Sequence, residues 1–235
     1  MSTLAPSSPR ERILQAALAL LEGGGVEAVS SRAVSAAAEV QTPTIYRQFG
    51  DMQGLLDAVA SAGFTTYLGA KLAQARGGDP VAELCAGWTL HVEFGLAHPH
   101  LYTLMYGTPR LGAECPAAQE AAALLRTLLQ RVAEAGRLAL SVDRAAALIH
   151  AAAVGGTLTL LGAPVRDEGL PERLLGAVLS AILTPEPSTP HGTVRQQAAA
   201  HAVALIALLP ELAAPFSRAE RTLLVEWLGR IVDRI

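Results

Sequence analysis

The stretch SSRAVSAAAEVQTPTIYRQFGDMQGLL, residues 30–56, indicates the fold more strongly than any other part of the chain. Apolar residues recur at helical spacing in its first third, behind Ser30 and Ser31, whose hydroxyls suit the N-cap of a helix. We therefore expect a short helix over residues 31–38. Its buried face would consist of Val34, Ala37 and Ala38.

A second short helix is expected almost at once. Thr42 is a candidate N-cap, and Pro43 suits the first helical position, where a backbone N–H is not needed. Ile45 and Phe49 lie four residues apart, so both side chains turn inward on the same side of the helix. Only about three residues connect the two helices, which is the length expected of a helix-turn-helix.

Opposite Ile45 and Phe49, the second helix carries polar groups and a cation but no acid. Such groups donate hydrogen bonds to phosphate oxygens or read base edges in a major groove that admits one helix. Two short helices around an apolar turn also occur in helical proteins that bind no nucleic acid. The outward residues are Gln41, Thr42, Thr44, Tyr46 and Arg47.

The order T-P-T-I-Y-R-Q-F-G-D, residues 42–51, followed by Leu55 and Leu56, resembles the recognition-helix signature of TetR-type transcriptional repressors. The resemblance covers residues 9–60 closely and the rest of the chain only in pattern. It implies a set of residues that approach bases, sugars or phosphates of DNA. These are Ser31, Arg32, Gln41, Thr42, Pro43, Thr44, Tyr46, Arg47 and Gln48.

Three positions depart from the family pattern. Glu39 stands in the turn where Gly is usual, and a left-handed backbone there would cost a non-glycine residue about 1 kcal/mol. Gln48 replaces the usual His and keeps hydrogen-bonding capacity without a titratable group. Met52 replaces the usual Lys at the start of the next helix and cannot pair with a phosphate.

The first 60 residues carry an unusual charge for a DNA-binding segment, because a basic patch is the common footprint of such proteins. Four arginines stand against six acidic residues, a net charge of −2, and the whole chain carries −3. We expect modest affinity for DNA and a shallow salt dependence. Arg10 and Arg12 either touch phosphate or form a solvated first helical turn.

Apolar periodicity and capping residues predict an all-α chain of about ten to eleven helices. Residues 1–57 would form a three-helix helix-turn-helix DNA-binding domain. Residues 58–235 would form a larger ligand-binding and dimerisation domain with two extra C-terminal helices. A capping box at Ser8–Glu11 begins the first helix, and Asp51 begins a long helix that runs to about Arg76. The other helices are expected at residues 80–97, 101–106, 116–135, 142–162, 174–182, 193–209 and 218–235.

The 235-residue chain is 51% hydrophobic and 17% charged, as in a compact helical protein. The N-terminus shows no signal peptide, and Cys85 and Cys115 show no metal or redox spacing, so we expect a cytoplasmic protein. Residues 145–165 carry no charge and are long enough to cross a bilayer. Their Ala and Gly content, His150 and the lack of aromatic anchors favour a buried helix of a soluble protein without membrane association.

Aromatic residues concentrate between residues 88 and 106 in a chain that is only 4% aromatic. A mostly apolar cavity with a few polar groups is typical of a small-molecule site, although aromatic residues at helical spacing are as typical of ordinary core. A metal site at Cys85 and His91 is a weaker interpretation, because six residues separate them. The candidate ligand-binding residues are Trp88, His91, Phe94, Tyr102, Met105, Tyr106 and His150.

Motifs for phosphate binding, nucleophilic catalysis or zinc binding are absent from the sequence, so we expect neither an enzyme nor a cofactor. The resemblance implies a repressor that binds a palindromic double-stranded DNA operator as a homodimer, paired through the helices near 142–162 and 174–182. A small apolar effector would release it. The alternative is a helical small-molecule-binding protein that has lost DNA binding, which Met52, Glu39 and the acidic head favour. A helical enzyme is a third interpretation, which a bound metal or cofactor would identify.

Overall fold

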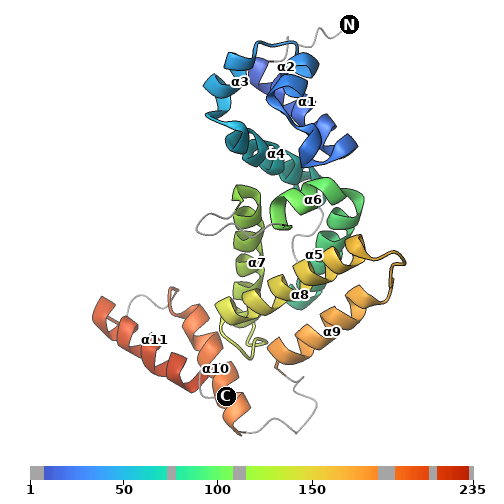
Figure 1. Ribbon diagram of the computed structural model, residues 1–235. Helices are drawn as coiled ribbons and strands as arrows, with labels where there is room; N and C mark the ends of the chain where they lie inside the picture. The colour runs from blue at the N-terminus through green and yellow to red at the C-terminus, as the bar shows by residue number, and fades with distance from the viewer. Residues whose placement is uncertain (1–7, 73–77, 108–114, 185–193, 212–215, 233–235) are drawn as a thin grey trace, which may run out of the picture. The chain divides into compact units, whose positions relative to one another are not determined.

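The computed structural model describes residues 8–72, 78–107, 115–184, 194–211 and 216–232. Within these ranges the chain is all-α, as predicted, and the only β pairing is an isolated bridge between Leu138 and Leu183 (Figure 1). The elements are α1 (Pro9–Gly24), the 3-10 helix η1 (Val26–Ala28), α2 (Ser31–Ala38), α3 (Thr42–Phe49), α4 (Met52–Leu72), α5 (Pro80–Ala97), α6 (Pro99–Tyr106), α7 (Pro116–Glu134), α8 (Val142–Gly162), α9 (Leu170–Ile182), α10 (Val194–Leu208) and α11 (Arg218–Val232).

The chain divides into two compact units, which we describe separately. Unit 1 consists of residues 1–76, 93–121 and 160–162, and unit 2 consists of residues 77–92, 122–159 and 163–235. Helices α1 to α4 and α6 therefore belong to unit 1, and α9 to α11 belong to unit 2. The predicted domain boundary at residue 57 falls inside α4 and stays a prediction.

In unit 1, α1 begins with the predicted capping box. The Ser8 hydroxyl accepts the Glu11 N–H at 3.2 Å, and the Glu11 carboxylate accepts the Ser8 N–H at 2.7 Å. Three residues of α1 are fully buried at helical spacing, and the helix packs against α2, α3, α4 and α6. These residues are Ile13, Ala17 and Leu21.

Helix α2 begins at the Ser30 N-cap, whose hydroxyl accepts the Ala33 N–H at 3.2 Å. Val34 and Ala38 are buried, but Ala37 is exposed, which corrects the predicted inward face. A helix of two turns directs only a narrow line of side chains, spaced four apart, toward α1. Ala37 lies beside that line.

Helix α4 begins at Asp51, as predicted, because its carboxylate accepts the Gly54 N–H at 2.7 Å. Gly63 of α4 lies directly against Leu101 of α6, both within unit 1. The predicted end of this helix near Arg76 lies outside the described residues. So do the predicted start of a helix at residue 193 and the predicted end of the last helix at residue 235.

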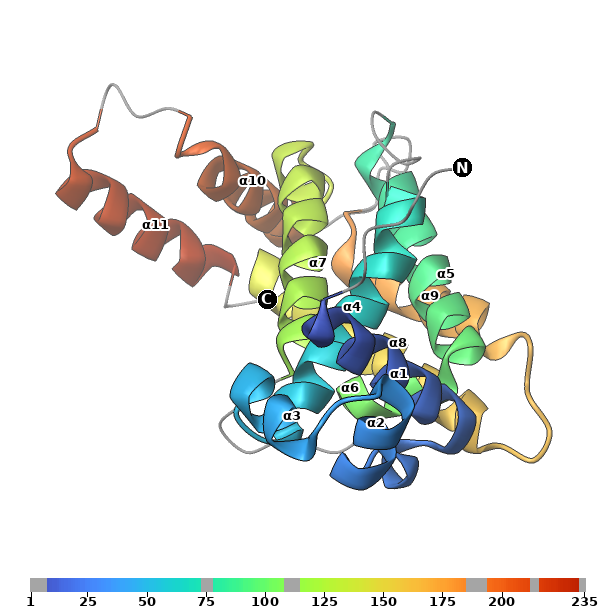
Figure 2. The same cartoon turned by 90° about the horizontal axis from the view of Figure 1, so that it is seen from above.

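In unit 2, ion pairs join helices that are distant in sequence. Arg131 of α7 forms a two-pronged ion pair with Glu83 of α5, with Nη2 to Oε1 at 3.0 Å. Helices α8 and α9 lie side by side, and the Leu174 side chain reaches the open face of Gly156. Helices α10 and α11 also pack side by side (Figures 1 and 2).

Helix α8 is the only described helix that is long and apolar enough to cross a membrane. A third of the residues in its most apolar stretch are buried. The predicted burial of this helix therefore holds for one face only. One face buries Ala145, Ile149 and Ala153, whereas Leu148 on another face is 44% exposed. Small Ala and Gly side chains allow one face to pack closely inside unit 2 while the opposite face stays open.

Candidate nucleic-acid interface

Helix α3 has one buried and one exposed side. Ile45 is completely buried, while Tyr46 is 43% exposed and Arg47 and Gln48 are also exposed. Gln41 and Pro43 are exposed at the start of the helix, and Thr42 and Thr44 are half-buried. The outward surface predicted from the sequence is thus accessible in unit 1, and Arg47 is its only charged side chain between residues 40 and 50.

The turn between α2 and α3 determines how α3 is held. Glu39 adopts the left-handed conformation, with φ 53° and ψ 48°. The next residue closes the end of α2, because the Val40 N–H donates to the Ser35 carbonyl at 3.1 Å, as in a Schellman motif. The position where Gly is usual in the family is therefore one that favours Gly on physical grounds.

Thr42 does not cap α3, contrary to the prediction. The N-cap residue is Gln41, and its side chain makes no capping hydrogen bond. The Thr42 hydroxyl instead lies 3.0 Å from the Ser35 hydroxyl of α2. This hydrogen bond joins the two helices of the helix-turn-helix directly, so Thr42 fixes their relative position.

The two arginines of the first helical turn both contact the protein. The Arg10 guanidinium lies over the ring of the half-buried Phe49, 5.0 Å from its centroid, and covers part of it. The Arg12 Nε donates to the Ala38 carbonyl at 3.3 Å, at the C-terminal end of α2. Both contacts brace the ends of the helix-turn-helix, and neither side chain is simply a solvated cation. Ser31 is half-buried and Arg32 exposed on α2.

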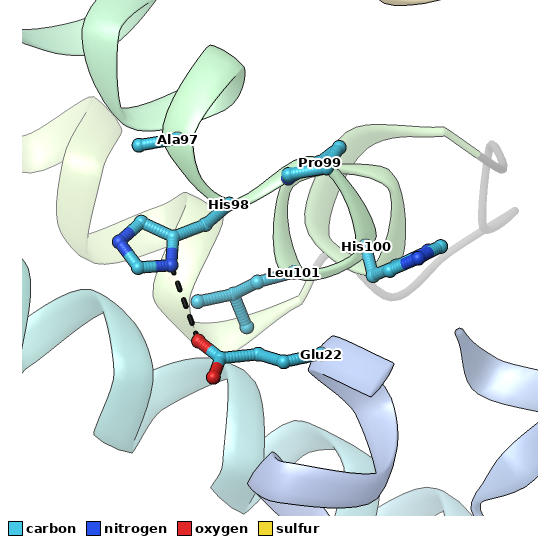
Figure 3. Close-up of a pocket in the computed structure, with 6 residues that line it drawn as sticks. All are labelled: Glu22, Ala97, His98, Pro99, His100 and Leu101. Carbon is cyan, nitrogen blue, oxygen red and sulfur yellow. Dashed lines mark hydrogen bonds and ion pairs between the residues drawn. The ribbon is translucent and has the colours of Figure 1, made fainter. Parts of the chain in front are cut away.

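A second feature of unit 1 is a pocket of about 240 Å³ at the junction of α1 with α6 (Figure 3). The His98 ring points toward Glu22, with Nδ1 to Oε1 at 3.2 Å, whereas the His100 ring points away from it. Its lining residues are Glu22, Ala97, His98, Pro99, His100 and Leu101. None of the seven predicted ligand-binding residues belongs to this pocket.

Four of the predicted ligand-binding residues lie in unit 1. The Phe94 and Tyr102 ring centroids are 6.2 Å apart, and those of Tyr102 and Tyr106 are 4.8 Å apart. Met105, which directly precedes Tyr106 in the sequence, is also buried. Burial, with Tyr102 and Cys115 nearby, raises the pKa of the Tyr106 phenol above its usual range. The phenol therefore stays uncharged at neutral pH.

The other three predicted ligand-binding residues lie in unit 2. Trp88 is 5% exposed, His91 is half-buried and His150 is exposed. Burial, followed by the proximity of His150, lowers the pKa of His91 to about 4. His91 is thus a neutral imidazole at physiological pH. Whether these seven residues form one ligand site stays a prediction.

Two buried polar atoms of unit 2 have no hydrogen-bond partner among the described residues. They are the Trp88 indole Nε1 on α5 and the hydroxyl of Thr157 on α8, which is completely buried. Leaving a buried donor unpaired costs about 1–3 kcal/mol, so such groups are often paired by a ligand or water. Sequence reasoning missed Thr157, because a threonine in an Ala-rich helix gives no signal of burial.

The described residues include no cluster of three or more metal-ligating side chains. Cys85 and His91 both lie on α5, six residues apart. Burial, with Asp79 nearby, raises the pKa of the Cys85 thiol, so this sulfur is a poor nucleophile and a poor metal ligand at neutral pH.

Residues 13–59 match the family model described as bacterial regulatory proteins of the tetR family. No curated protein matches the sequence. A solved structure of a protein with unknown function from Rhodococcus sp. RHA1 is 26% identical, with a TM-score of 0.59 over 78% of this chain and 100% of that one.

Two further solved structures share the fold. A putative tetR family transcription regulator from Shewanella sp. PV-4 is 18% identical, with a TM-score of 0.60 over 76% of this chain and 100% of that one. RolR, solved in complex with resorcinol, is 21% identical, with a TM-score of 0.60 over 83% of this chain and 92% of that one.

Proposed function

We propose that this chain, a TetR-type DNA-binding transcriptional regulator through its N-terminal domain, is a cytoplasmic repressor that a small apolar molecule releases from its operator. The observation that carries the proposal is the outward side of α3. It presents Tyr46, Arg47 and Gln48 to solvent, while Ile45 anchors the helix from behind. A helix presented in this way fits a major groove.

The proposed division of labour follows from the contacts of each side chain. Arg47 would pair with a phosphate, Gln48 would read base edges, and Tyr46 and Thr44 would contact phosphates or sugars. Arg32 and Ser31, on α2, would contact the backbone of the same half-site. Gln41, Thr42 and Pro43 open α3, where the positive end of the helix dipole favours phosphate oxygens. Thr42 contributes mainly by holding α2 and α3 together.

A mobility-shift assay and a footprint on the DNA that flanks its own gene test this part. We expect protection of a palindrome. Arg47→Ala should weaken binding by about 1–3 kcal/mol for each helix-turn-helix domain that contacts the DNA. Tyr46→Phe removes one hydroxyl and should weaken binding less. Arg218→Ala, an exposed change on α11, serves as the matched control and should leave binding unchanged. No protected site in any flanking DNA would contradict the proposal.

The effector part of the proposal is supported by the unpaired Trp88 and Thr157 atoms of unit 2. A molecule with an apolar body and one or two hydrogen-bonding groups would satisfy them without burying a charge. The neutral His91 adds no charge to unit 2 at physiological pH. A protein of the same fold, RolR, holds resorcinol, a small uncharged aromatic molecule.

Effector binding would lower the affinity for the operator, and operator binding would lower the affinity for the effector by the same factor. The two changes are equal because one coupling free energy links the two sites. A thermal-shift screen of small neutral aromatic molecules, with resorcinol among them, would identify a binder, and that binder should weaken operator affinity. Trp88→Phe and Thr157→Val should each reduce the thermal shift while leaving affinity for DNA unchanged. A binder that leaves operator affinity unchanged would refute this mechanism.

The homodimer is proposed to form through α8 and α9, whose open faces carry small and apolar side chains. Leu148 is exposed on α8, and nothing lies within 4 Å of the Cβ position of Gly155 on the same helix or of Gly176 on α9. A second backbone could therefore approach these faces closely. A single monomeric mass in solution at micromolar concentration would contradict this pairing.

The second candidate function is a small-molecule-binding protein that no longer binds DNA. The net charge of −2 over the first 60 residues, Met52 in place of Lys and the left-handed Glu39 favour it. The footprint distinguishes the two, because a protein of this second kind would bind its ligand and protect no DNA.

A further inference from the structure

The helical hairpin of α10 and α11 exposes an unusual amount of apolar surface. Twelve large hydrophobic side chains are exposed among the described residues, and seven of them belong to this hairpin or to the residues that enter α11. Concentrated exposed apolar surface marks an interaction site more often than scattered residues do. The seven are Leu205, Leu208, Phe216, Leu223, Val225, Trp227 and Ile231.

We propose that a second copy of this chain covers the exposed ridge of α11, which consists of Leu223, Trp227 and Ile231. These residues are spaced four apart, so they form one line along the helix. They are 43%, 54% and 43% exposed. Val232 is buried and Leu224 and Leu228 are half-buried on an adjoining side, so the ridge is separate from the part of α11 that is already covered.

The spacing of the ridge favours a copy of the same helix as the partner. Leu223 and Ile231 lie equally far from Trp227, one on each side. When two α11 helices pack antiparallel about a twofold axis at Trp227, the two tryptophans meet and each Leu223 meets the Ile231 of the second copy. An isologous interface requires this kind of self-complementarity, whereas an unrelated partner does not.

The charges beside the ridge fit the same arrangement. Glu226 and Arg230 form an ion pair on one flank of α11. At about 1.5 Å per residue, Glu226 lies about 1.5 Å before Trp227 and Arg230 about 4.5 Å after it. Reversal of the second helix places each Glu226 about 3 Å along the axis from the Arg230 of the second copy. The two Glu226 residues also lie about 3 Å apart along the axis, and the two Arg230 residues about 9 Å apart. Two attractive pairs against one close repulsive pair leave a net attraction between the flanks.

The apolar area of the ridge fits a weak contact. Leu223, Trp227 and Ile231 are 43–54% exposed, and with full areas of about 150–250 Å² each they offer roughly 300 Å² per copy. Pairing of two ridges would bury about 600 Å² in total, which is the size of a weak or transient contact. The contact would therefore act in addition to the α8 and α9 faces, and it does not rest on the proposed function.

Sedimentation velocity across a concentration series tests the proposal with Trp227→Glu and a matched control, Thr222→Glu, an exposed position on another side of α11. We expect the wild type and Thr222→Glu to form a species larger than the one that Trp227→Glu forms. The dissociation constant of that larger species should rise by at least about 30-fold in Trp227→Glu, as for an interface hot spot. Equal behaviour of all three proteins would overturn the proposal.

Cross-linking gives an independent readout of the same geometry. In a chain with Cys85→Ser and Cys115→Ser, Trp227→Cys places a thiol on the proposed twofold axis. Diamide should link two copies through it at a protein concentration at which this variant still self-associates in sedimentation velocity. Thr222→Cys in the same background and at the same concentration should not form this link. Circular dichroism establishes that each variant is folded. Absence of a link at 227 in folded protein would refute the antiparallel pairing, and equal linking at both positions would do so too.

Discussion

Glu39 is the only non-glycine residue with a positive φ in the described part of the chain, and it lies between the two helices of the helix-turn-helix. Its backbone is satisfied and its side chain is exposed, so the strain is purely conformational. Glu39→Gly should therefore stabilise the protein against unfolding, by up to about 1 kcal/mol after the extra entropy of the unfolded chain is subtracted.

Denaturant unfolding measures this change, and Ala36→Gly is the matched control. Ala36 is exposed within α2 and has helical backbone angles, so glycine there should destabilise the protein by about 1 kcal/mol. The opposite signs of two glycine substitutions three residues apart would identify the left-handed turn as the cause. Destabilisation by Glu39→Gly would show that this explanation is wrong.

His91 gives the stability of the protein a dependence on pH. Burial and the nearby His150 lower its pKa to about 4, whereas a histidine in an unfolded chain titrates near 6.5. Between these values the unfolded chain binds a proton that the folded chain does not, so stability falls as the pH drops from about 6.5 to about 4. The partial exposure of His91 keeps the effect below roughly 3 kcal/mol.

The free energy of unfolding, measured from pH 7.5 to pH 4.5, tests this expectation. His91→Gln cannot titrate in this range and should flatten the curve. His201→Gln, an exposed histidine of α10, should leave the slope as in the wild type. If His91→Gln keeps the full slope, the loss of stability at low pH has another origin.

Among the elements, the contact between α4 and α6 leaves no room for a methyl group. A Cβ on Gly63 would lie 2.5 Å from the Leu101 Cδ2, and Leu101 is buried. Although alanine favours a helix, the overpacking should make Gly63→Ala destabilising by about 1–3 kcal/mol. Gly87→Ala in α5 meets Leu128 only at 3.6 Å and should instead stabilise by about 1 kcal/mol. Thermal unfolding of both variants checks the pair, and a stabilised Gly63→Ala would contradict the packing argument.

The first residue of a helix could be predicted from the sequence where the side chain of the N-cap residue accepts a backbone N–H in the first turn of that helix. Ser8, Asp51, Asp79 and Ser141 each accept a backbone N–H two or three residues later, as their residue types suggest. Thr42 was misassigned because its hydroxyl has a tertiary partner in Ser35, and side-chain propensity does not reveal such a partner.

The contacts around the candidate site were harder to predict than its exposed surface. Helical periodicity was enough to predict that Tyr46 and Arg47 are outward and Ile45 inward. The contact of Arg10 with Phe49 joins residues 39 positions apart, and the burial of Thr157 depends on which helices surround α8. Both depend on tertiary packing, which has no local signal in the sequence.

For the whole molecule, the distribution of cations determines how DNA binding should respond to salt. Two of the four arginines of the first 60 residues are engaged within the protein, Arg10 with Phe49 and Arg12 with Ala38. Arg32 and Arg47 are the remaining arginines of that segment, and both are exposed. The two N-terminal helix-turn-helix domains of a dimer, with two arginines each, would neutralise about four phosphates. This number predicts a slope of log K against log salt of about −3.6.

The variant Arg47→Gln makes this prediction a test of assembly as well as of charge. If both heads of a dimer bind the operator, the loss of two phosphate contacts should flatten the slope by about 1.8, whereas a single bound head would give about 0.9. Fluorescence anisotropy titrations of a labelled operator measure both slopes. The titrations are repeated at salt concentrations from about 50 to about 300 mM, a range over which the Debye length changes substantially. A wild-type slope as steep as about −8 would require roughly nine neutralised phosphates, and a head with net charge −2 would then have to recruit cations from elsewhere in the chain.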